Sequence, residues 1–361
     1  MAGMKRAIGL MSGTSADGVD AAIITTDGEV RVETGAWLTH PYPDDLRQTI
    51  RGVNPMDEAA VVAIEETITG AHAELVARVL EKAGANSDDI DVIGFHGHTI
   101  LHRPDQHQTR QIGDGAALAR MTGIDVVNDF RSADVAAGGQ GAPLAPFYHR
   151  ALAAALPKPI AVLHLGGVGN VTWLGASDAD ILAFDTGPAN ALLDDWAERH
   201  TGRAVDLDGA LAASGEIDDQ AVARLMADPY FALPPPKSLD RDHFAVNANT
   251  VLAGMSAADG AATLVAFTAS SVAHAVASFP APVSRWLITG GGRHNPVLMA
   301  ALVAWLGAPV DPVEAVGWQG DALEAQAFAY FAVRSLAGLP ITSPTTTGGP
   351  RPLTGGVLAR A

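Results

Sequence analysis

The chain has 361 residues, of which 48% are hydrophobic and 17% are charged, and its formal net charge is −17. This composition excludes a disordered or fibrous chain, and the length suits two domains better than one core. The acidic charge argues against nucleic acid as the main partner, because such binding draws on clustered Lys and Arg. The chain contains no cysteine, which excludes disulfide frameworks and thiolate metal sites.

We expect neither a signal peptide nor a membrane span. Lys5 and Arg6 are followed directly by a loop of small residues that signal cleavage would remove. The least polar stretch, residues 261–279, is interrupted by threonine, serine and histidine residues and is typical of a buried helix. These features predict a cytoplasmic protein that has no membrane partner.

The first predicted element is a hairpin near the N-terminus. Apolar runs at residues 8–11 and 21–25 flank a loop of small and acidic residues, which is typical of two strands joined by a turn. Glycines let backbone N–H groups approach an anion, hydroxyl groups add donors, and two carboxylates indicate a Mg²⁺ ion beside the phosphate. A polar turn without a ligand is the alternative. The predicted ATP-binding residues are Gly13, Thr14, Ser15, Ala16, Asp17, Gly18, Val19 and Asp20, with Asp17 and Asp20 as metal ligands.

The segments that follow alternate between strand and helix patterns, which favours a mostly parallel α/β architecture with an antiparallel opening. A Gly-rich break at residues 136–146 is the candidate hinge. The predicted helices are 57–83, 147–155, 190–200, 249–279 and 321–336, and the further predicted strands lie in 29–39, 90–95, 124–127, 159–165, 171–174, 181–184 and 286–289.

The hairpin pattern recurs in the second half, where a Gly-rich turn separates the apolar runs 159–165 and 171–174. Repetition is a stronger signal than either loop alone. Two α/β halves that each offer a phosphate-binding hairpin resemble the actin, Hsp70 and hexokinase ATPases, and the resemblance implies a nucleotide cleft between two domains. The expected domains are 1–135 and 136–361, with a last helix that can pack back on the first domain. The predicted ATP contacts of the second domain are Gly166, Gly167 and Asn170 in the hairpin and Gly290, Gly291 and Gly292 beside the adenosine.

Asp185 is the candidate catalytic residue. It follows the apolar run 181–184 and precedes a predicted helix, where a carboxylate can lie close to a substrate. Its natural role is that of a general base that takes a proton from a hydroxyl group or from water during phosphoryl transfer. Capping of the helix is the structural alternative.

Two other segments have both a functional and a structural interpretation. A short region contains four histidines, namely His96, His98, His102 and His107. The His-x-His spacing is found in metal sites, but no Glu motif accompanies it here. We therefore favour contacts of His96, His98 and Thr99 to a sugar or phosphate over a transition-metal site. The proline run at residues 234–238 is most simply a stiff surface loop, with a substrate lid as the alternative.

Taken together, the motifs resemble the anhydro-N-acetylmuramic acid kinase family. The resemblance implies an ATP- and Mg²⁺-dependent kinase that converts 1,6-anhydro-N-acetylmuramic acid and water into N-acetylmuramic acid 6-phosphate in peptidoglycan recycling, with Asp185 activating the water. We also expect a homodimer. The matching segments are 12–20, 96–99, 111–114, 129–131, 138–143, 165–170, 184–188, 235–238, 289–292 and 324–329, which together span nearly the whole chain.

The resemblance adds Arg131 and Glu324 to His96 and Thr99 as expected sugar contacts. The sequence departs from the family's pattern at three positions, where His98 replaces an expected Gln, His164 an expected Asn and Ala189 an expected Gly. Two alternatives remain open at this point. One is an ordinary hexose or amino-sugar kinase of the same fold, and the other is an ATP-gated, chaperone-like ATPase.

Overall fold

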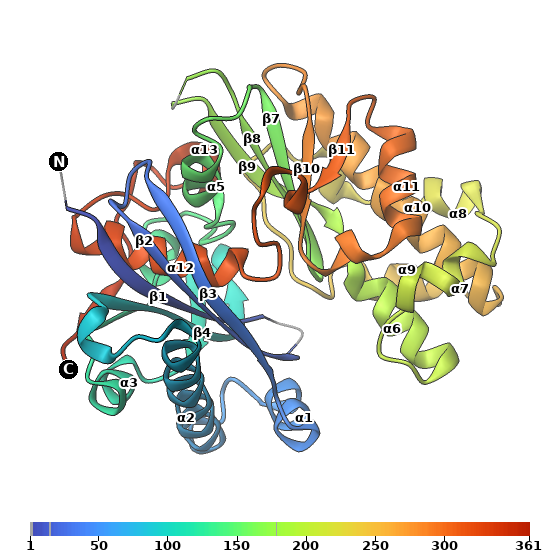
Figure 1. Ribbon diagram of the computed structural model, residues 1–361. Coiled ribbons are helices and arrows are strands. Elements are labelled where there is room, and N and C mark those ends of the chain that lie inside the picture. Colours follow the sequence, from blue (N-terminus) through green and yellow to red (C-terminus); the bar gives the residue numbers. More distant parts are fainter. Residues whose placement is uncertain (1–2, 14–15, 178) are drawn as a thin grey trace. The chain divides into compact units, whose positions relative to one another are not determined.

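The computed structural model describes residues 3–13, 16–177 and 179–361, and the chain forms two compact units (Figure 1). Unit 1 contains residues 1–155 and 322–361, and unit 2 contains residues 156–321. Each unit has its own mixed β-sheet covered by helices.

The sheet of unit 1 has the strand order β12-β6-β4-β1-β2-β3, and β5 pairs with β4. β1, β2 and β3 form an antiparallel meander, whereas β4 runs parallel to β1 and β6 runs parallel to β4. The strands are β1 (Lys5–Ser12), β2 (Gly18–Thr26), β3 (Val32–Pro41), β4 (Val92–Arg103), β5 (Gln108–Ile112), β6 (Val126–Asn128) and β12 (Val357–Ala359).

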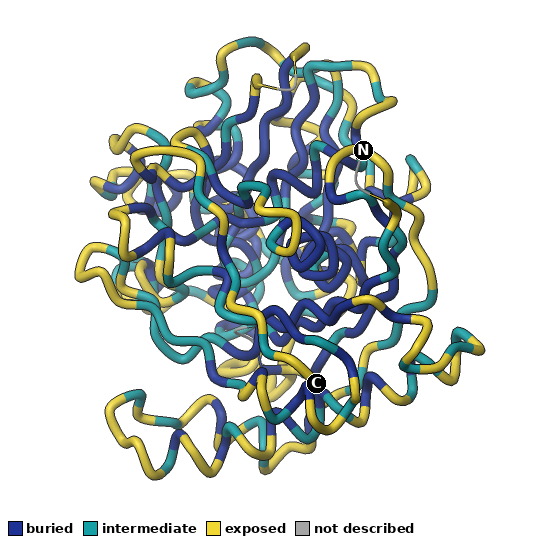
Figure 2. Tube along the Cα trace, turned by 90° about the vertical axis from the view of Figure 1, so that its left-hand side faces the viewer, coloured by how far each residue is buried: buried dark blue, intermediate teal, exposed yellow. Residues whose placement is uncertain are grey.

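Two long helices pack on opposite faces of this sheet. Helix α2 begins at its cap Asp57, ends at Gly84 in the left-handed conformation, and packs on Ile8 and Leu10 of β1. Helix α12 packs on the other face, which carries Gly9, because alternate strand residues point to opposite faces. Residues 325–334 of α12 are all buried (Figure 2). The helices of unit 1 are α1 (Asp44–Gly52), α2 (Glu58–Ala83), α3 (Gly115–Thr122), α4 (Ser132–Ala136), α5 (Pro146–Leu152), α12 (Leu323–Leu336) and α13 (Pro344–Thr347).

The sheet of unit 2 repeats this topology. Its order is β11-β10-β7-β8-β9, with an antiparallel β7-β8-β9 meander and with β10 and β11 parallel to β7. This matches the β6-β4-β1-β2-β3 part of unit 1. The repeat confirms the expected α/β plan of two similar halves that the actin, Hsp70 and hexokinase ATPases share. The strands are β7 (Ile160–Leu165), β8 (Val168–Leu174), β9 (Ile181–Pro188), β10 (Trp286–Thr289) and β11 (Val310–Pro312).

Helix α10 forms the centre of unit 2. Among the described residues, the segment Ala257–Ser278 is the one helix long and apolar enough to cross a membrane, but 72% of its apolar window is buried inside the protein, as expected for a core helix. The single helix expected over residues 249–279 is divided near Gly254, whose φ of 85° does not fit a helix. The helices of unit 2 are α6 (Asn190–Thr201), α7 (Ala210–Ala213), α8 (Asp219–Met226), α9 (Ala245–Val251), α10 (Ala257–Ala275) and α11 (Pro296–Trp305).

The division between the units differs from the expected boundary at residues 135 and 136. The Gly-rich segment that we expected to act as a hinge lies inside unit 1. Its backbone is fixed there, because Gly141 N–H donates to the Asp134 carboxylate (2.8 Å) and Gln140 N–H donates to the Thr347 carbonyl (2.6 Å). The chain leaves unit 1 after Ala155 and returns to it at Ala322, so that α12 belongs with the first strands.

Candidate active site

The first hairpin joins β1 to β2. Ala16 N–H donates to the Gly13 carbonyl (2.9 Å), and Ala16 has a positive φ of 53°. The side chains of Ala16 and Val19 are buried in the core of unit 1, so only their backbone can contact a ligand. A Cβ at Gly18 would lie 2.3 Å from the His40 carbonyl oxygen, which explains the glycine. Thr14 and Ser15, also predicted to bind ATP, lie outside the described residues.

Asp17 and Asp20, the predicted metal ligands, each have a partner within unit 1. Asp17 forms an ion pair with Arg47 (2.5 Å) while its side chain is 61% exposed, and Asp20 accepts a hydrogen bond from the Thr39 hydroxyl (2.5 Å). The described residues contain no group of three His, Cys, Asp or Glu side chains arranged for a metal. Two carboxylates still fit Mg²⁺, which proteins bind through one or two carboxylates, substrate phosphates and water.

His96 of β4 and Arg131, two predicted sugar contacts, lie in direct contact. His96 Nε2 accepts a hydrogen bond from Arg131 Nε (3.0 Å), and His96 Nδ1 lies 2.9 Å from the Gly97 carbonyl oxygen. Because a guanidinium only donates, the proton of the neutral imidazole is on Nδ1. Burial, and secondly the charge of Arg131, hold the pKa of His96 well below its ordinary value. His96 is therefore a neutral acceptor that orients Arg131.

The other predicted sugar contacts also lie in unit 1. Thr99 accepts a hydrogen bond from Gln111 Nε2 (3.2 Å). Glu324 is half-buried in the first turn of α12. It precedes Phe328 by one helical turn, and the Phe328 ring lies 4.5 Å from the His96 ring. Since residues four apart lie on the same side of a helix, Glu324 is on the side of α12 that faces His96.

Ser12, His98 and Tyr42 form a hydrogen-bonded chain that sequence reasoning missed. The Tyr42 hydroxyl donates to Ser12 Oγ (3.1 Å), and Ser12 Oγ lies 3.0 Å from His98 Nδ1. Burial lowers the pKa of His98 to about 4 and raises that of Tyr42 to about 12. The signal available in the sequence was that Ser12 and His98 follow two apolar runs, which the structure pairs as the parallel neighbours β1 and β4.

The second hairpin joins β7 to β8 and is tied to helix α6. The Gly166 carbonyl accepts the N–H of Asn190 (2.9 Å), and the Gly167 carbonyl accepts those of Ala189 (3.1 Å) and Ala191 (3.2 Å). The first N–H groups of α6 therefore already have partners in the hairpin, which fixes the hairpin to the helix.

The Gly290–Gly292 segment lies directly against this hairpin. Gly290 has a φ of 78°, and a Cβ there would lie 2.6 Å from the Leu165 carbonyl oxygen. A Cβ at Gly292 would lie 2.6 Å from Leu165 Cβ and 3.1 Å from Asn190 Oδ1. The two glycine-rich segments predicted to bind ATP are thus brought together, and Asn190 links them through its hydrogen bond to the Leu165 carbonyl (2.9 Å).

A row of polar side chains crosses the sheet of unit 2 beside these segments. Thr289 of β10 pairs with His164 of β7, His164 pairs with Asn170 of β8, and Asn170 pairs with Asp185 of β9. Register partners on neighbouring strands share one face of the sheet. The predicted base and the predicted hairpin contact Asn170 therefore lie side by side, and His164, a departure from the family's pattern, lies in the same row.

Asp185 is 6% exposed and is held by a segment later in the chain. Leu239 N–H donates to the Asp185 carboxylate (2.7 Å), and Asp185 N–H donates to the Lys237 carbonyl (2.9 Å). The Tyr230 hydroxyl donates to the Asp185 carbonyl (2.5 Å). A backbone N–H aimed at a carboxylate stabilises its ionised form, which a general base requires.

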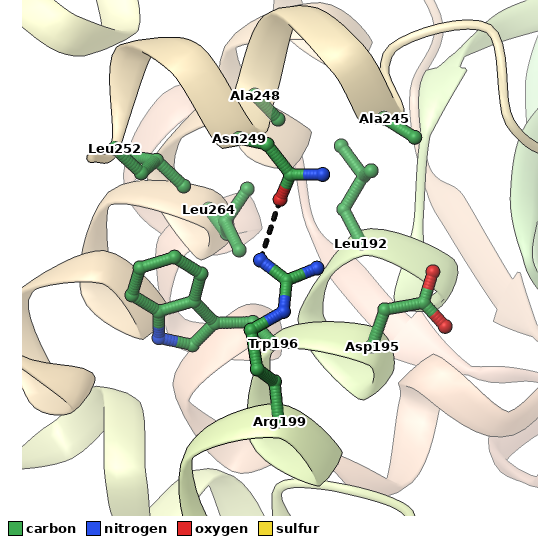
Figure 3. A pocket seen from close by; sticks show the side chains of 9 residues that line it. All are labelled: Leu192, Asp195, Trp196, Arg199, Ala245, Ala248, Asn249, Leu252 and Leu264. Atoms are coloured by element: carbon green, nitrogen blue, oxygen red, sulfur yellow. Dashed lines mark hydrogen bonds between the residues drawn. The ribbon is translucent and has the colours of Figure 1, made fainter.

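A small pocket elsewhere in unit 2 contains none of these residues (Figure 3). Its polar groups bond to protein groups, since Arg199 donates to Asn249 (2.6 Å) and Asp195 pairs with Arg241 (2.7 Å). The pocket is lined by Leu192, Asp195, Trp196, Arg199, Ala245, Ala248, Asn249, Leu252 and Leu264.

Comparison with known proteins identifies the family of this chain. Residues 5–361 match the family described as anhydro-N-acetylmuramic acid kinase. The kinase of this name from Paramagnetospirillum magneticum is 59% identical over 97% of this chain and 98% of its own length, and that from Rhodospirillum rubrum is 57% identical over 97% and 93%. Among solved structures, component A of the Acidaminococcus fermentans (R)-2-hydroxyglutaryl-CoA dehydratase has a TM-score of 0.48 and 16% identity, covering 91% of this chain and 99% of that one. The chain belongs to the anhydro-N-acetylmuramic acid kinase family.

Proposed function

We propose that the protein converts 1,6-anhydro-N-acetylmuramic acid, water and ATP into N-acetylmuramic acid 6-phosphate and ADP, as a step of cell-wall recycling. The observation that carries this proposal is the buried Asp185 carboxylate, which receives the Leu239 N–H and lies beside the Gly-rich hairpin in a chain of this kinase family. A phosphotransferase of this family uses ATP, and the cytoplasm, where ATP is made, is the expected compartment.

The reaction couples two bond changes. Water attacks the anomeric carbon while Asp185 accepts one of its protons, and the bond between that carbon and the bridging O6 breaks. The electron pair of that bond goes to O6, which forms a new bond to the γ-phosphorus of ATP as ADP leaves. Asp185 then releases its proton to solvent. The water oxygen ends on the anomeric carbon, and O6 ends in the phosphate ester.

The remaining roles are proposed for each unit separately. In unit 2, Gly166, Gly167, Asn170 and the Gly290–Gly292 segment would contact ATP, because their bare backbone lets a nucleotide approach closely. In unit 1, the hairpin of Gly13 and Gly18 would contact the phosphates. Asp17 and Asp20 would hold Mg²⁺, which neutralises charge on the phosphates when it is bound.

The sugar contacts proposed for unit 1 are His96, Thr99, Arg131 and Glu324. Of these four residues, Arg131 has the best physical support as a sugar contact. Its guanidinium is held in place by the neutral His96 and by the Gly141 carbonyl, which lies 2.6 Å from Arg131 Nη1. A fixed guanidinium suits the carboxylate of a muramic acid, which it can bind through two parallel hydrogen bonds.

Product analysis in ¹⁸O-labelled water tests the proposal. With ATP and 1,6-anhydro-N-acetylmuramic acid, one ¹⁸O atom should appear on the anomeric carbon and none in the phosphate ester. Unlabelled product kept in the same water measures spontaneous exchange. Efficient phosphorylation of N-acetylmuramic acid or of a hexose would instead indicate an ordinary sugar kinase, and release of free phosphate with either sugar would indicate an ATPase.

A further inference from the structure

The segment that follows the short helix Pro229–Ala232 contains a buried lysine that the proposed mechanism does not use. The proline run expected to be a stiff surface loop is exposed at Pro234, but Lys237 immediately after it is only 9% exposed. Tyr230, in the short helix before the segment, is 4% exposed. A lysine is almost never this buried unless a charged or polar group holds it.

Lys237, Tyr230 and Asp185 form a closed ring of hydrogen bonds. Lys237 Nζ donates to the Tyr230 carbonyl (3.0 Å), the Tyr230 hydroxyl donates to the Asp185 carbonyl (2.5 Å), and Asp185 N–H donates to the Lys237 carbonyl (2.9 Å). The ammonium also lies over the Tyr230 ring, 4.2 Å from its centre. Loss of the Lys237 side chain would open this ring at its link to Tyr230, the residue whose hydroxyl holds the Asp185 backbone.

The charge of Lys237 interacts with that of Asp185. Burial lowers the pKa of Lys237, and the negative charge of Asp185 acts in the opposite direction and favours the ammonium form. The interaction is reciprocal, so the ammonium favours the carboxylate form of Asp185. Two other titratable groups belong to this part of the site: Tyr230, whose hydroxyl donates to the Asp185 carbonyl, and His164, which lies two strands away in the polar row.

Packing alone does not account for a charged group at this position. An ammonium is costly to desolvate in a protein interior, and an apolar side chain of similar length would fill the same space without that cost. A cation beside a general base has a direct use, because it keeps the carboxylate ionised and able to accept a proton.

We propose that Lys237 is a positioning residue for the reaction, whose ammonium keeps Asp185 ionised and whose hydrogen bond to Tyr230 fixes the backbone that carries it. This inference rests on the proposed function of Asp185 as the base. It assigns a task to the Pro-Lys segment as a support of the catalytic carboxylate rather than as a lid over the substrate.

The first experiment compares pH profiles of kcat/KM for wild type, Lys237→Met and Tyr230→Phe. Lys237→Met keeps most of the length of the side chain and removes its charge, so the acid limb should move to higher pH by about one unit, while calorimetric binding of ATP and sugar stays within a factor of about three. Tyr230→Phe keeps Lys237 charged and should lower kcat without moving the limb. Lys237→Arg should restore the position of the limb. If Lys237→Met folds and the acid limb of its pH profile stays at the wild-type pH, the proposal is wrong.

A second measurement keeps the test decisive if Lys237→Met does not fold. In Asp185→Asn, which preserves the shape of the site, loss of the carboxylate should lower the pKa of Lys237, followed by the ¹³C shift of its ε-carbon. An identical titration in both proteins would show that the two charges are not coupled. Normal turnover of Asp185→Asn would refute the proposed base and leave the coupling result standing, so the two failures are distinguishable.

Discussion

Gly9 of β1 and Gly94 of β4 lie opposite each other in register, and both face the backbone of α12. A Cβ on Gly9 would lie 1.7 Å from the Ala325 carbonyl oxygen, and one on Gly94 would lie 2.0 Å from that of Phe328. The obstructing atoms belong to a helix backbone, which cannot rotate away as a side chain can. This pair of glycines therefore sets how closely α12 approaches the sheet, and with it the position of Glu324.

Gly9→Ala should destabilise the protein on the order of 2–3 kcal/mol, because the added methyl group forces α12 away from β1. Gly70→Ala is the matched control: Gly70 lies inside helix α2 with nothing within 4 Å of its Cβ position, so alanine should stabilise by up to about 1 kcal/mol. Urea unfolding of the three proteins checks both values. If Gly9→Ala and wild type are equally stable, α12 can move away from β1 without loss of stability, and the prediction is wrong.

Asp185→Asn should lower kcat by about 10²–10⁴-fold, because the amide keeps the shape and can accept the Leu239 N–H but cannot take a proton. Calorimetry should show ATP and sugar binding nearly unchanged. Asp180→Asn, an exposed aspartate just before the same strand, should keep full turnover. Near-normal turnover of Asp185→Asn would leave Asp185 as a structural residue only.

Asp17→Asn should raise the Mg²⁺ concentration needed for half-maximal activity by about tenfold, since one carboxylate near the cation is lost. Binding of the sugar without nucleotide should not change. Arg47→Met separates the two causes, because it breaks the ion pair of Asp17 with Arg47 but keeps the carboxylate. If Arg47→Met reproduces the whole defect, the ion pair rather than the metal is responsible.

Stability should fall as the pH is lowered from 6.5 towards 4. Burial lowers the pKa of His72 and of His98 from 6.5 to about 4. In this window the unfolded chain binds protons at both histidines while the folded protein does not, so the free energy of unfolding decreases with decreasing pH. Each histidine accounts for a loss of about 2 kcal/mol between pH 7 and pH 5.

His72→Leu isolates one of these contributions. The variant lacks the hydrogen bond to the Ile68 carbonyl and is expected to be less stable at pH 7, but its further loss between pH 7 and pH 5 should be smaller than that of wild type by about 2 kcal/mol. Urea unfolding at both pH values measures this difference. A loss equal to that of wild type would mean that His72 takes up its proton in the folded state as easily as in the unfolded chain.

The structural features that are best predicted from the sequence are those that depend on residues close together in the chain. Both hairpins were predictable because an apolar run, a Gly-rich turn and a second apolar run are local patterns, and their repetition indicated two similar sheets. The end of α2 at Gly84 was predictable for the same reason. These features depend on backbone conformation and strand pairing over short separations.

Contacts between distant residues could not be predicted in this way. Ser12 bonds to His98, 86 positions later, and Leu239 bonds to Asp185, 54 positions earlier. The proline run suggested a surface loop, since nothing local indicates that Lys237 turns inward. The domain boundary at residues 135 and 136 was placed by composition, whereas the units follow packing, which returns residues 322–361 to unit 1.

The return of the chain to unit 1 has a consequence for synthesis. Arg334 of α12 donates a hydrogen bond to the Gly28 carbonyl, 306 positions earlier, so unit 1 requires segments that lie on both sides of unit 2 in the sequence. Unit 2 is one continuous stretch, and all of its residues leave the ribosome before α12 does. Until then the sheet face that carries Gly9 and Gly94 has no helix over it. A chain that stops short of residue 322 can therefore complete unit 2 but not unit 1, and activity requires synthesis to continue through α12.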